Sequence, residues 1–233
     1  MSRPWAPSGV LKAKKNSQMT VLIVGSTGMI GKLIVQHCIN SIEFTDIRCL
    51  VRNPSGTTHA KLTEIVIDNF EDYTNHVDLF KDIDVAFFCL GVYTGQVSDE
   101  KFKLITVNYA VEFAAVLKQQ SPKATLCLLS GMGADRTEKS STAFAKYKGM
   151  AENQISALHL KFYAFRPGYI YPVEKRKEPN LGYQFFRFTY PITKYLGKGA
   201  SIKSTELAAA MFHVGLKGAT TEIIENRAIF QYV

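Results

Sequence analysis

Short runs of apolar, often β-branched residues alternate along the chain with stretches in which apolar residues recur every three or four positions. The short runs are typical of buried strands, and the longer spacing is typical of helices that cover a core with one face. This pattern predicts strands at Thr20–Val24 and in the segments DIRCLVR, LTEIVID, DIDVAFFCLG, ATLCLLS and KFYAFRPG. It also predicts helices after the first strand and at Lys101–Gln119, Ser140–Leu158 and Ser204–Leu216, with a weaker strand at Ala228–Tyr232.

A regular alternation of strands and helices implies right-handed crossovers and a doubly wound parallel sheet, that is, an α/β Rossmann fold. Ligands of such sheets bind outside the carboxyl ends of the strands, where the strand order reverses. The crevice is therefore expected after the first, fourth and fifth strands. We expect residues 19–233 to form a single domain of this kind, with a small C-terminal lobe on the substrate side.

Composition and charge narrow the classes of function. Hydrophobic residues make up 46% and charged residues 21% of the 233 residues, as in a soluble globular protein. No apolar run approaches the roughly 20 residues that a membrane-spanning helix needs. Of the net charge of +8, residues 1–18 contribute +4 and residues 172–203 contribute +5, so the remainder carries −1. The body of the protein thus lacks the broad basic surface that nucleic-acid binding requires.

The basic segment 1–18 contains two prolines and no periodic apolar pattern, which predicts a disordered tail. It is either a native arm or a leader that precedes a start at Met19. A mitochondrial presequence is a further alternative, less favoured because the amphipathic pattern is poor.

Cysteine and histidine residues indicate neither a metal site nor a hydrolase. The four cysteines are scattered through apolar segments without a CxxC or Cys/His cluster, which predicts reduced thiols in a cytoplasmic protein and no bound metal. They are Cys38, Cys49, Cys89 and Cys127. The histidines stand singly, and none accompanies a serine or cysteine motif.

A glycine motif, GxxGxxG, lies between the first predicted strand and the helix that follows it. Glycine permits a tight turn, lets backbone N–H groups approach a pyrophosphate, and lets strand and helix pack closely. The helix N-terminus would add partial positive charge. This context favours dinucleotide binding over a purely structural glycine turn. The candidate cofactor-binding residues of the loop are Gly25, Ser26, Thr27, Gly28, Met29, Ile30 and Gly31.

The second predicted strand ends in Val51 and Arg52, where an NAD-binding protein usually has an acidic residue for the ribose 2′-hydroxyl. Arginine at this place can pair with a 2′-phosphate. We therefore favour NADP(H) over NAD(H), with Lys61 as a second contact; the alternative is a solvated surface arginine.

Two further strand ends carry candidate cofactor contacts. Asp68 and Asn69 close the third strand, where the adenine edge would lie. Cys89, Leu90 and Gly91 close the fourth strand, where a small residue lets the cofactor pass.

The segments VGSTGMIG, CLVRNP, DVAFFCLGVYTG, LLSGMGAD, KGMAEN and FRPGYIYP occur in an order and spacing that resemble the short-chain dehydrogenase/reductase superfamily. They are most similar to its atypical branch, which includes the Tat-interacting-protein-like and NmrA-like proteins. The resemblance implies a nicotinamide cofactor beside Pro167 and Gly168, and a catalytic Ser, Tyr and Lys. It further implies pairing as a homodimer through the helices expected at Lys101–Gln119 and Ser140–Leu158.

Active members of the superfamily carry Tyr-x-x-x-Lys on the helix after the fifth strand, where tyrosine exchanges the proton and lysine holds the ribose. Lys148 matches the lysine, followed by Gly149 and Glu152 as in the branch, but the tyrosine position is Phe144, which has no hydroxyl. Tyr147 lies about 60° around the helix from that position, and reaches the cleft only if the helix is rotated or shifted. Otherwise it packs at the helix edge.

The serine position is also altered. Ser130 is present, but branch members often carry a second serine where Gly131 stands. The candidate catalytic residues are therefore Ser130, Tyr147 and Lys148.

The basic, aromatic segment 172–203 is the variable substrate-side part of the chain. It would form a lid over an anionic or flat, aromatic small molecule, a patch for a partner or a membrane surface, or the packing of a C-terminal lobe. The sequence thus predicts an NADP(H)-dependent reductase with an atypical proton donor, acting on a small carbonyl or conjugated substrate. The alternative is a non-catalytic NADP(H)-binding redox sensor or scaffold.

Overall fold

The structure is a computed structural model that describes residues 18–92, 95–173 and 199–233. The tail expected at residues 1–18 and the substrate-side segment 172–203 therefore lie almost wholly outside the described residues. So do the lid, patch and lobe-packing roles considered for that segment.

Seven parallel strands form the central sheet, in the order β3-β2-β1-β4-β5-β6-β9. The order reverses between β1 and β4, which is the switch point of a doubly wound sheet. This observation confirms the predicted α/β Rossmann fold. The strands are β1 (Met19–Val24), β2 (Phe44–Val51), β3 (Leu62–Val66), β4 (Val85–Phe88), β5 (Thr125–Leu129), β6 (Lys161–Arg166) and β9 (Ile223–Glu225).

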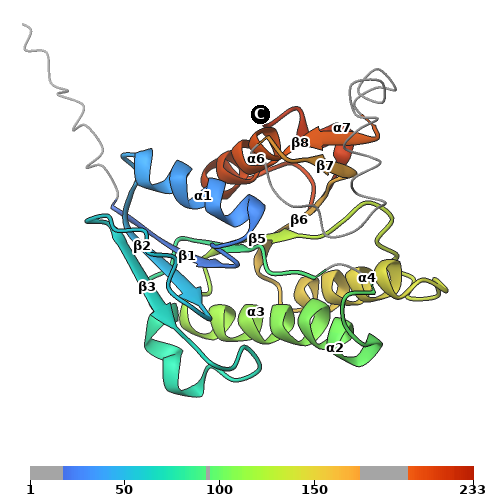
Figure 1. The fold of residues 1–233 in the computed structure, drawn as a ribbon, viewed down its shortest axis with the longest axis horizontal. Helices are drawn as coiled ribbons and strands as arrows, with labels where there is room; N and C mark the ends of the chain where they lie inside the picture. The colour runs from blue at the N-terminus through green and yellow to red at the C-terminus, as the bar shows by residue number, and fades with distance from the viewer. Residues whose placement is uncertain (1–17, 93–94, 174–198) are drawn as a thin grey trace, which may run out of the picture.

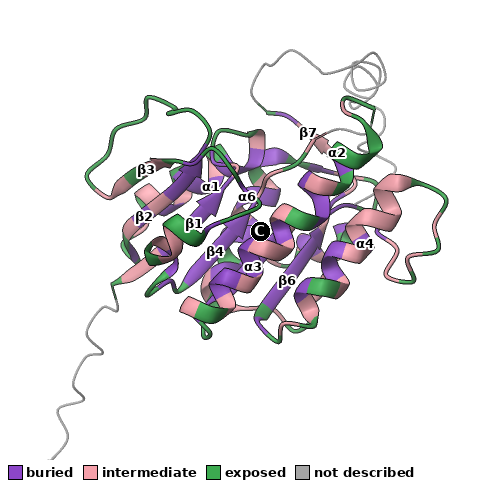
Figure 2. Cartoon of the chain, turned by 90° about the horizontal axis from the view of Figure 1, so that it is seen from below, coloured by how far each residue is buried: buried purple, intermediate pink, exposed green. Residues whose placement is uncertain are grey.

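Helices cover both faces of this sheet (Figure 1). One layer contains α1 (Met29–Asn40), α6 (Ser204–Lys217) and the short α7 (Asn226–Ile229). The other contains α3 (Tyr109–Gln120), α4 (Ala143–Ser156) and the 3₁₀ helix η1 (Thr74–Phe80). Because the inner strands β1, β4, β5 and β6 are covered on both sides, they read as continuous apolar runs and are mostly buried, whereas the edge strand β3 contains no fully buried residue (Figure 2).

The helix expected at Lys101–Gln119 is longer and less regular than its sequence pattern indicates. It runs as α2 (Asp99–Lys103), a π-helical turn η2 (Leu104–Asn108) and then α3. Ser98 caps it by accepting a hydrogen bond from the backbone N–H of Lys101. The π turn was not predicted, because such turns are rare and occur mostly as single turns inside α-helices.

The prediction of a strand at Ala228–Tyr232 was wrong. The last strand is β9, which pairs through Ile223 and Ile224 with β6, and the chain then turns into α7. Asn226 explains the turn, because its side chain accepts from the Gly168 N–H and donates to the Ser201 carbonyl. These two bonds tie it to a small parallel sheet that was not predicted, β7 (Tyr169–Tyr171) with β8 (Ser201–Lys203).

Within the three described ranges, no helix combines the length and the apolar character needed to cross a membrane. In the same ranges, no group of three or more His, Cys, Asp or Glu side chains could hold a metal ion.

Candidate functional site

The glycine loop lies at the switch point and fills the space between the ends of β1 and β4. Gly25 has φ +81°, and a Cβ added to it would lie 2.6 Å from the carbonyl carbon of Cys89. A Cβ added to Gly31 would lie 2.1 Å from the carbonyl oxygen of Gly25. No side chain fits at either position, so the turn that brings α1 against β1 requires glycine at both.

The N-terminus of α1 opens beside this turn. Gly28 is the residue before the helix, no side chain caps the first turn, and that turn holds no acidic residue. Thr27 and Gly28 are exposed, whereas Ser26 is buried. Free N–H groups and the positive end of the helix dipole are suited to an anion. These residues therefore fit a pyrophosphate, whose oxygens the backbone N–H groups of the loop would hold.

Arg52 lies beside the loop, because β2 and β1 are in register with Leu50 opposite Val24. Its side chain is exposed and forms no ion pair with another described residue. Lys61 lies elsewhere: its ammonium donates to the carbonyls of Ile39 and Ser41 at the far end of α1. The structure thus keeps Arg52 at the expected place and does not bring Lys61 to it.

The ends of β3 and β4 lie at the same carboxyl edge of the sheet as the glycine loop. Asp68 and Asn69 follow β3 and are exposed. Cys89 follows β4 and donates its backbone N–H to Val24, while Gly91 is exposed with open space around it. Burial raises the pKa of the Cys89 thiol to about 12. At neutral pH the side chain is therefore protonated, and it contributes an apolar surface and not a nucleophile.

Helix α4 brings Lys148 to the end of β5. The half-buried Lys148 side chain donates from Nζ to the carbonyl oxygen of Leu129, at 3.0 Å. Burial lowers the pKa of its ammonium group to about 8, although the nearby Glu152 carboxylate favours the charged form. Lys148 is therefore a cation at neutral pH that loses its proton unusually easily.

Phe144, one helical turn before Lys148, points its ring tip at Gly131. A Cβ added to Gly131 would lie 2.5 Å from Cζ of Phe144, so the ring occupies the space that a serine side chain at position 131 would need. Phe144 and Gly131, the two positions that depart from the superfamily pattern, thus lie against each other. A tyrosine hydroxyl at position 144 would extend from the same ring tip toward the Gly131 backbone.

Tyr147 points toward α2 and not toward the strand ends. Its hydroxyl donates to Oδ2 of Asp99 at 2.6 Å, and its ring lies 6.0 Å from that of Phe102. The hydrogen bond to Asp99 raises the pKa of Tyr147. A catalytic tyrosine of this superfamily needs the opposite shift, so the observed contacts do not equip Tyr147 for proton exchange.

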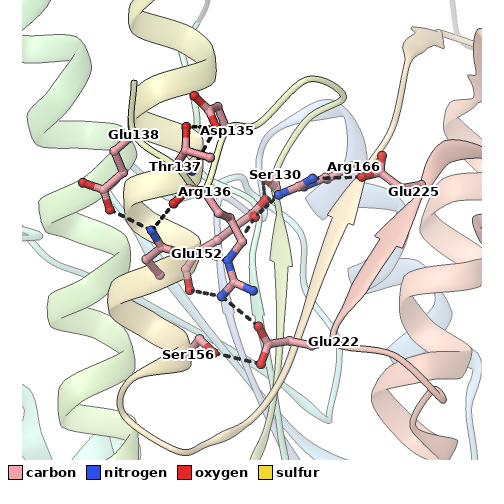
Figure 3. Close-up of polar contacts among 11 residues, drawn as sticks. Ser130, Asp135, Arg136, Thr137, Glu138, Glu152, Ser156, Arg166, Glu222 and Glu225 are labelled. Carbon is pink, nitrogen blue, oxygen red and sulfur yellow. Dashed lines mark hydrogen bonds and ion pairs between the residues drawn. The ribbon is translucent and has the colours of Figure 1, made fainter. Parts of the chain in front are cut away.

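Ser130, directly after β5, takes part in a largely buried polar network (Figure 3). Its hydroxyl donates to the carboxylate of Glu152, which is fully buried in α4. Arg166, at the end of β6, donates two hydrogen bonds to the same carboxylate and one to Glu225 of β9. Arg136 donates to the Glu152 backbone carbonyl and pairs with Glu222. The network thus fixes α4 to the ends of β5, β6 and β9.

Pro167 and Gly168 close β6 and join this network to the small sheet. The carbonyl oxygen of Pro167 accepts from the N–H of Met132, beside Ser130. A Cβ added to Gly168 would lie 2.3 Å from the carbonyl oxygen of Ala200. The backbone just before β8 therefore packs directly against Gly168.

The fold and the glycine loop together define a dinucleotide-binding α/β protein. Residues 25–214 match the NAD(P)H-binding family, and the chain belongs to that family. A curated relative, Protein FMP52, mitochondrial, from Debaryomyces hansenii, is 26% identical over 199 residues, which cover 75% of this chain and 82% of the relative. Probable polyketide synthase 39 from Dictyostelium discoideum is 27% identical over 101 residues, or 43% of this chain and only 3% of the synthase.

Solved structures share the fold at low sequence identity. A short-chain dehydrogenase from Burkholderia cenocepacia in complex with NADP has a TM-score of 0.65 and 11% identity, with 91% of this chain and 89% of that chain covered. The enzyme WbmG from Bordetella bronchiseptica, in complex with NAD, has a TM-score of 0.67 and 14% identity, with 91% and 73% covered. UDP-N-acetylglucosamine 4-epimerase from Methanobrevibacter ruminantium has a TM-score of 0.69 and 18% identity, with 90% and 76% covered. At these identities the matches show a shared fold, which agrees with the NAD(P)H-binding family match and with the resemblance to the short-chain dehydrogenase/reductase superfamily.

The polar network contains the residues that sequence analysis did not identify. Glu152 was noted only as a residue that follows Lys148, and Arg166 only as part of FRPG. One signal was present in the sequence: Glu152 lies four residues after Lys148, on the helix face that also contains the buried Ile155. Its partners could not be inferred, because they lie on strands that are distant along the chain.

Proposed function

We propose that this protein is an NADP(H)-dependent oxidoreductase that transfers hydride to a small carbonyl or conjugated substrate. The observation that carries the proposal is the loop of Gly25–Gly31 at the switch point, where two glycines admit no side chain and the N-terminus of α1 has neither a side-chain cap nor an acidic residue in its first turn. Membership of the NAD(P)H-binding family agrees with it. When bound, the nicotinamide would supply the hydride, and Lys148, Cys89 and Pro167 would border it.

The preference for NADP(H) rests on Arg52. It is exposed, it follows the strand next to the glycine loop, and no acidic residue occupies its place. A dianionic 2′-phosphate would form a charge-assisted contact with it, whereas a ribose hydroxyl would gain little.

Substitution of Arg52 tests this preference. We expect Arg52→Ala to weaken NADPH binding about tenfold, which corresponds to about 1.4 kcal/mol, and to leave NADH binding unchanged. The measurement is the dissociation constant of each cofactor by fluorescence titration. Lys123→Ala is the matched control, because Lys123 is exposed between α3 and β5, at the amino ends of the strands and away from the glycine loop. Equal losses for NADPH and NADH would remove the argument for NADP(H).

A second candidate function is a non-catalytic NADP(H) sensor or scaffold. Phe144 favours it, since the ring packs against Gly131 where the superfamily places catalytic hydroxyls, and Tyr147 is bonded to Asp99.

An isotope-transfer experiment distinguishes the oxidoreductase from the non-catalytic sensor or scaffold. The protein would be incubated with NADPH deuterated at C4 and with a panel of aldehydes, ketones and quinones. The oxidoreductase function predicts a product that carries deuterium in proportion to the NADPH oxidised. The sensor function predicts saturable binding of NADPH without labelled product from any member of the panel.

A further inference from the structure

Among the described residues near the end of β5, few groups have a proton that they could donate to a substrate. Phe144 has no hydroxyl, and the Tyr147 hydroxyl donates to Asp99 on α2. The Ser130 hydroxyl donates to the buried carboxylate of Glu152. Each hydroxyl hydrogen that the superfamily pattern would use is therefore absent or already bound to a carboxylate.

Lys148 differs from these groups in position and in bonding. It lies one helical turn after Phe144 on α4, and its Nζ reaches the carbonyl oxygen of Leu129 at the end of β5. An ammonium has three donors, and among the described residues one of them is used, in the hydrogen bond to Leu129. No ion pair joins Lys148 to an acidic residue in the described part of the chain. Glu152, one turn further along α4, and Cys89, at the end of β4, are the titratable groups that influence the pKa of Lys148.

We propose that Lys148 is the proton donor of this site. The role rests on the proposed oxidoreductase function and adds to it the group that replaces the missing tyrosine. A bound dihydronicotinamide would supply the hydride that forms the new C–H bond at the substrate carbonyl carbon as the C=O π bond breaks, so that the cofactor would be oxidised and the carbonyl reduced. The π electron pair moves to oxygen, which takes a proton from Lys148 Nζ. The neutral amine that remains is protonated again from water.

The acidity of Lys148 suits this task. A general acid is most effective when its pKa lies near the working pH, and burial lowers the pKa of Lys148 to about 8. An ordinary lysine, with a pKa near 10.4, would be a weaker acid by more than two orders of magnitude. Because only the protonated form donates, we expect the rate of carbonyl reduction to fall as the pH rises above about 8.

The experiment compares the wild-type protein with two variants, Lys148→Arg and Lys148→Met. Arginine keeps the positive charge but does not give up a proton at the working pH, because its pKa is above about 12. First, ¹³C-lysine-labelled protein is titrated by NMR with and without NADPH, and the Lys148 Cε resonance is assigned by its loss in Lys148→Met. Second, NADPH affinity and the pH profile of kcat are measured for all three proteins. We expect an NMR midpoint near pH 8, a kcat that falls above it, and a loss of at least about 100-fold in kcat for Lys148→Arg, with NADPH affinity retained.

Three results would overturn the proposal. The first is a Lys148 resonance that shows no titration below pH 10. The second is a Lys148→Arg variant that keeps the wild-type rate and pH profile. In both cases the protein remains a reductase and only the proton donor is wrong. The third is a wild-type protein that binds NADPH but reduces no carbonyl, which would refute the oxidoreductase function and this role together.

Discussion

Replacing Glu152 by alanine should lower the free energy of unfolding by about 3–5 kcal/mol, because removal of one partner leaves a largely buried charge uncompensated. Glu152 is fully buried, and its carboxylate holds Arg166, whose side chain is only 12% exposed. The same substitution removes the acceptor of the Ser130 hydroxyl. For a domain of this size, the loss corresponds to a decrease in Tm of about 6–20 °C.

Glu225 provides the matched control. It binds the same guanidinium of Arg166 at 2.9 Å, but its side chain is 53% exposed. Exposed ion pairs contribute about 1 kcal/mol or less, so Glu225→Ala should change stability only slightly. Urea denaturation of both variants, analysed for midpoint and slope, measures the difference. Equal costs for the two substitutions would show that burial of Glu152 is not what makes the network important.

The polar network adjoins Lys148 on α4. Glu152 is one helical turn after Lys148, and it ties α4 to β5 and β6. The position of the Lys148 ammonium therefore depends on the network, since its hydrogen bond to Leu129 spans the same two elements. A network of this kind fixes the geometry of a site without contacting the ligand.

Gly31→Ala is expected to abolish measurable dinucleotide binding, with a loss of affinity of about 100-fold or more, equivalent to about 2.7 kcal/mol. The added Cβ would lie 2.1 Å from the carbonyl oxygen of Gly25, which is backbone and cannot rotate away. Either α1 or the turn must move, and both supply the N–H groups that would hold a pyrophosphate. The measurement is the dissociation constant for NADPH, together with a thermal unfolding curve.

Two other glycines make this prediction specific. A Cβ at Gly28 would lie 3.2 Å from the Gly25 carbonyl oxygen, whereas Gly199 is surrounded by open space. We expect Gly28→Ala to reduce NADPH affinity to an intermediate degree and Gly199→Ala to leave it unchanged. If Gly31→Ala unfolds the protein, Gly28→Ala still tests the loop. Unaltered affinity in a folded Gly31→Ala or Gly28→Ala variant would contradict the assignment of the pyrophosphate to this turn.

Much of the fold could be predicted from local sequence patterns. The strand expected at Thr20–Val24 is β1 with one residue added, and the helix expected at Ser140–Leu158 contains α4. These elements are buried on both faces or carry a clear apolar stripe, so periodicity alone identifies them. The apolar run at Ala228–Tyr232 was wrongly predicted to be a strand, because its residues pack against the core from α7 and the turn that follows it.

The candidate site was predictable only in part. The glycine loop and Arg52 follow from residue types at strand ends, which local sequence reveals. The bond of Tyr147 to Asp99, the fit of Phe144 against Gly131 and the pairing of Glu152 with Arg166 each join different elements of the chain. Such contacts depend on strand register and helix rotation, which a single sequence does not encode in any short-range pattern.

Calorimetric titration of the wild-type protein with NADPH, and in parallel with NADH, tests the central claim most directly. The claim is that the loop from Gly25 to Gly31 holds a nicotinamide dinucleotide and that Arg52 selects the phosphorylated form. It predicts saturable binding of NADPH at one site per chain, with NADH weaker by about tenfold or more. Absence of binding by both cofactors to the folded protein would contradict the claim and would leave the glycine loop as a structural turn.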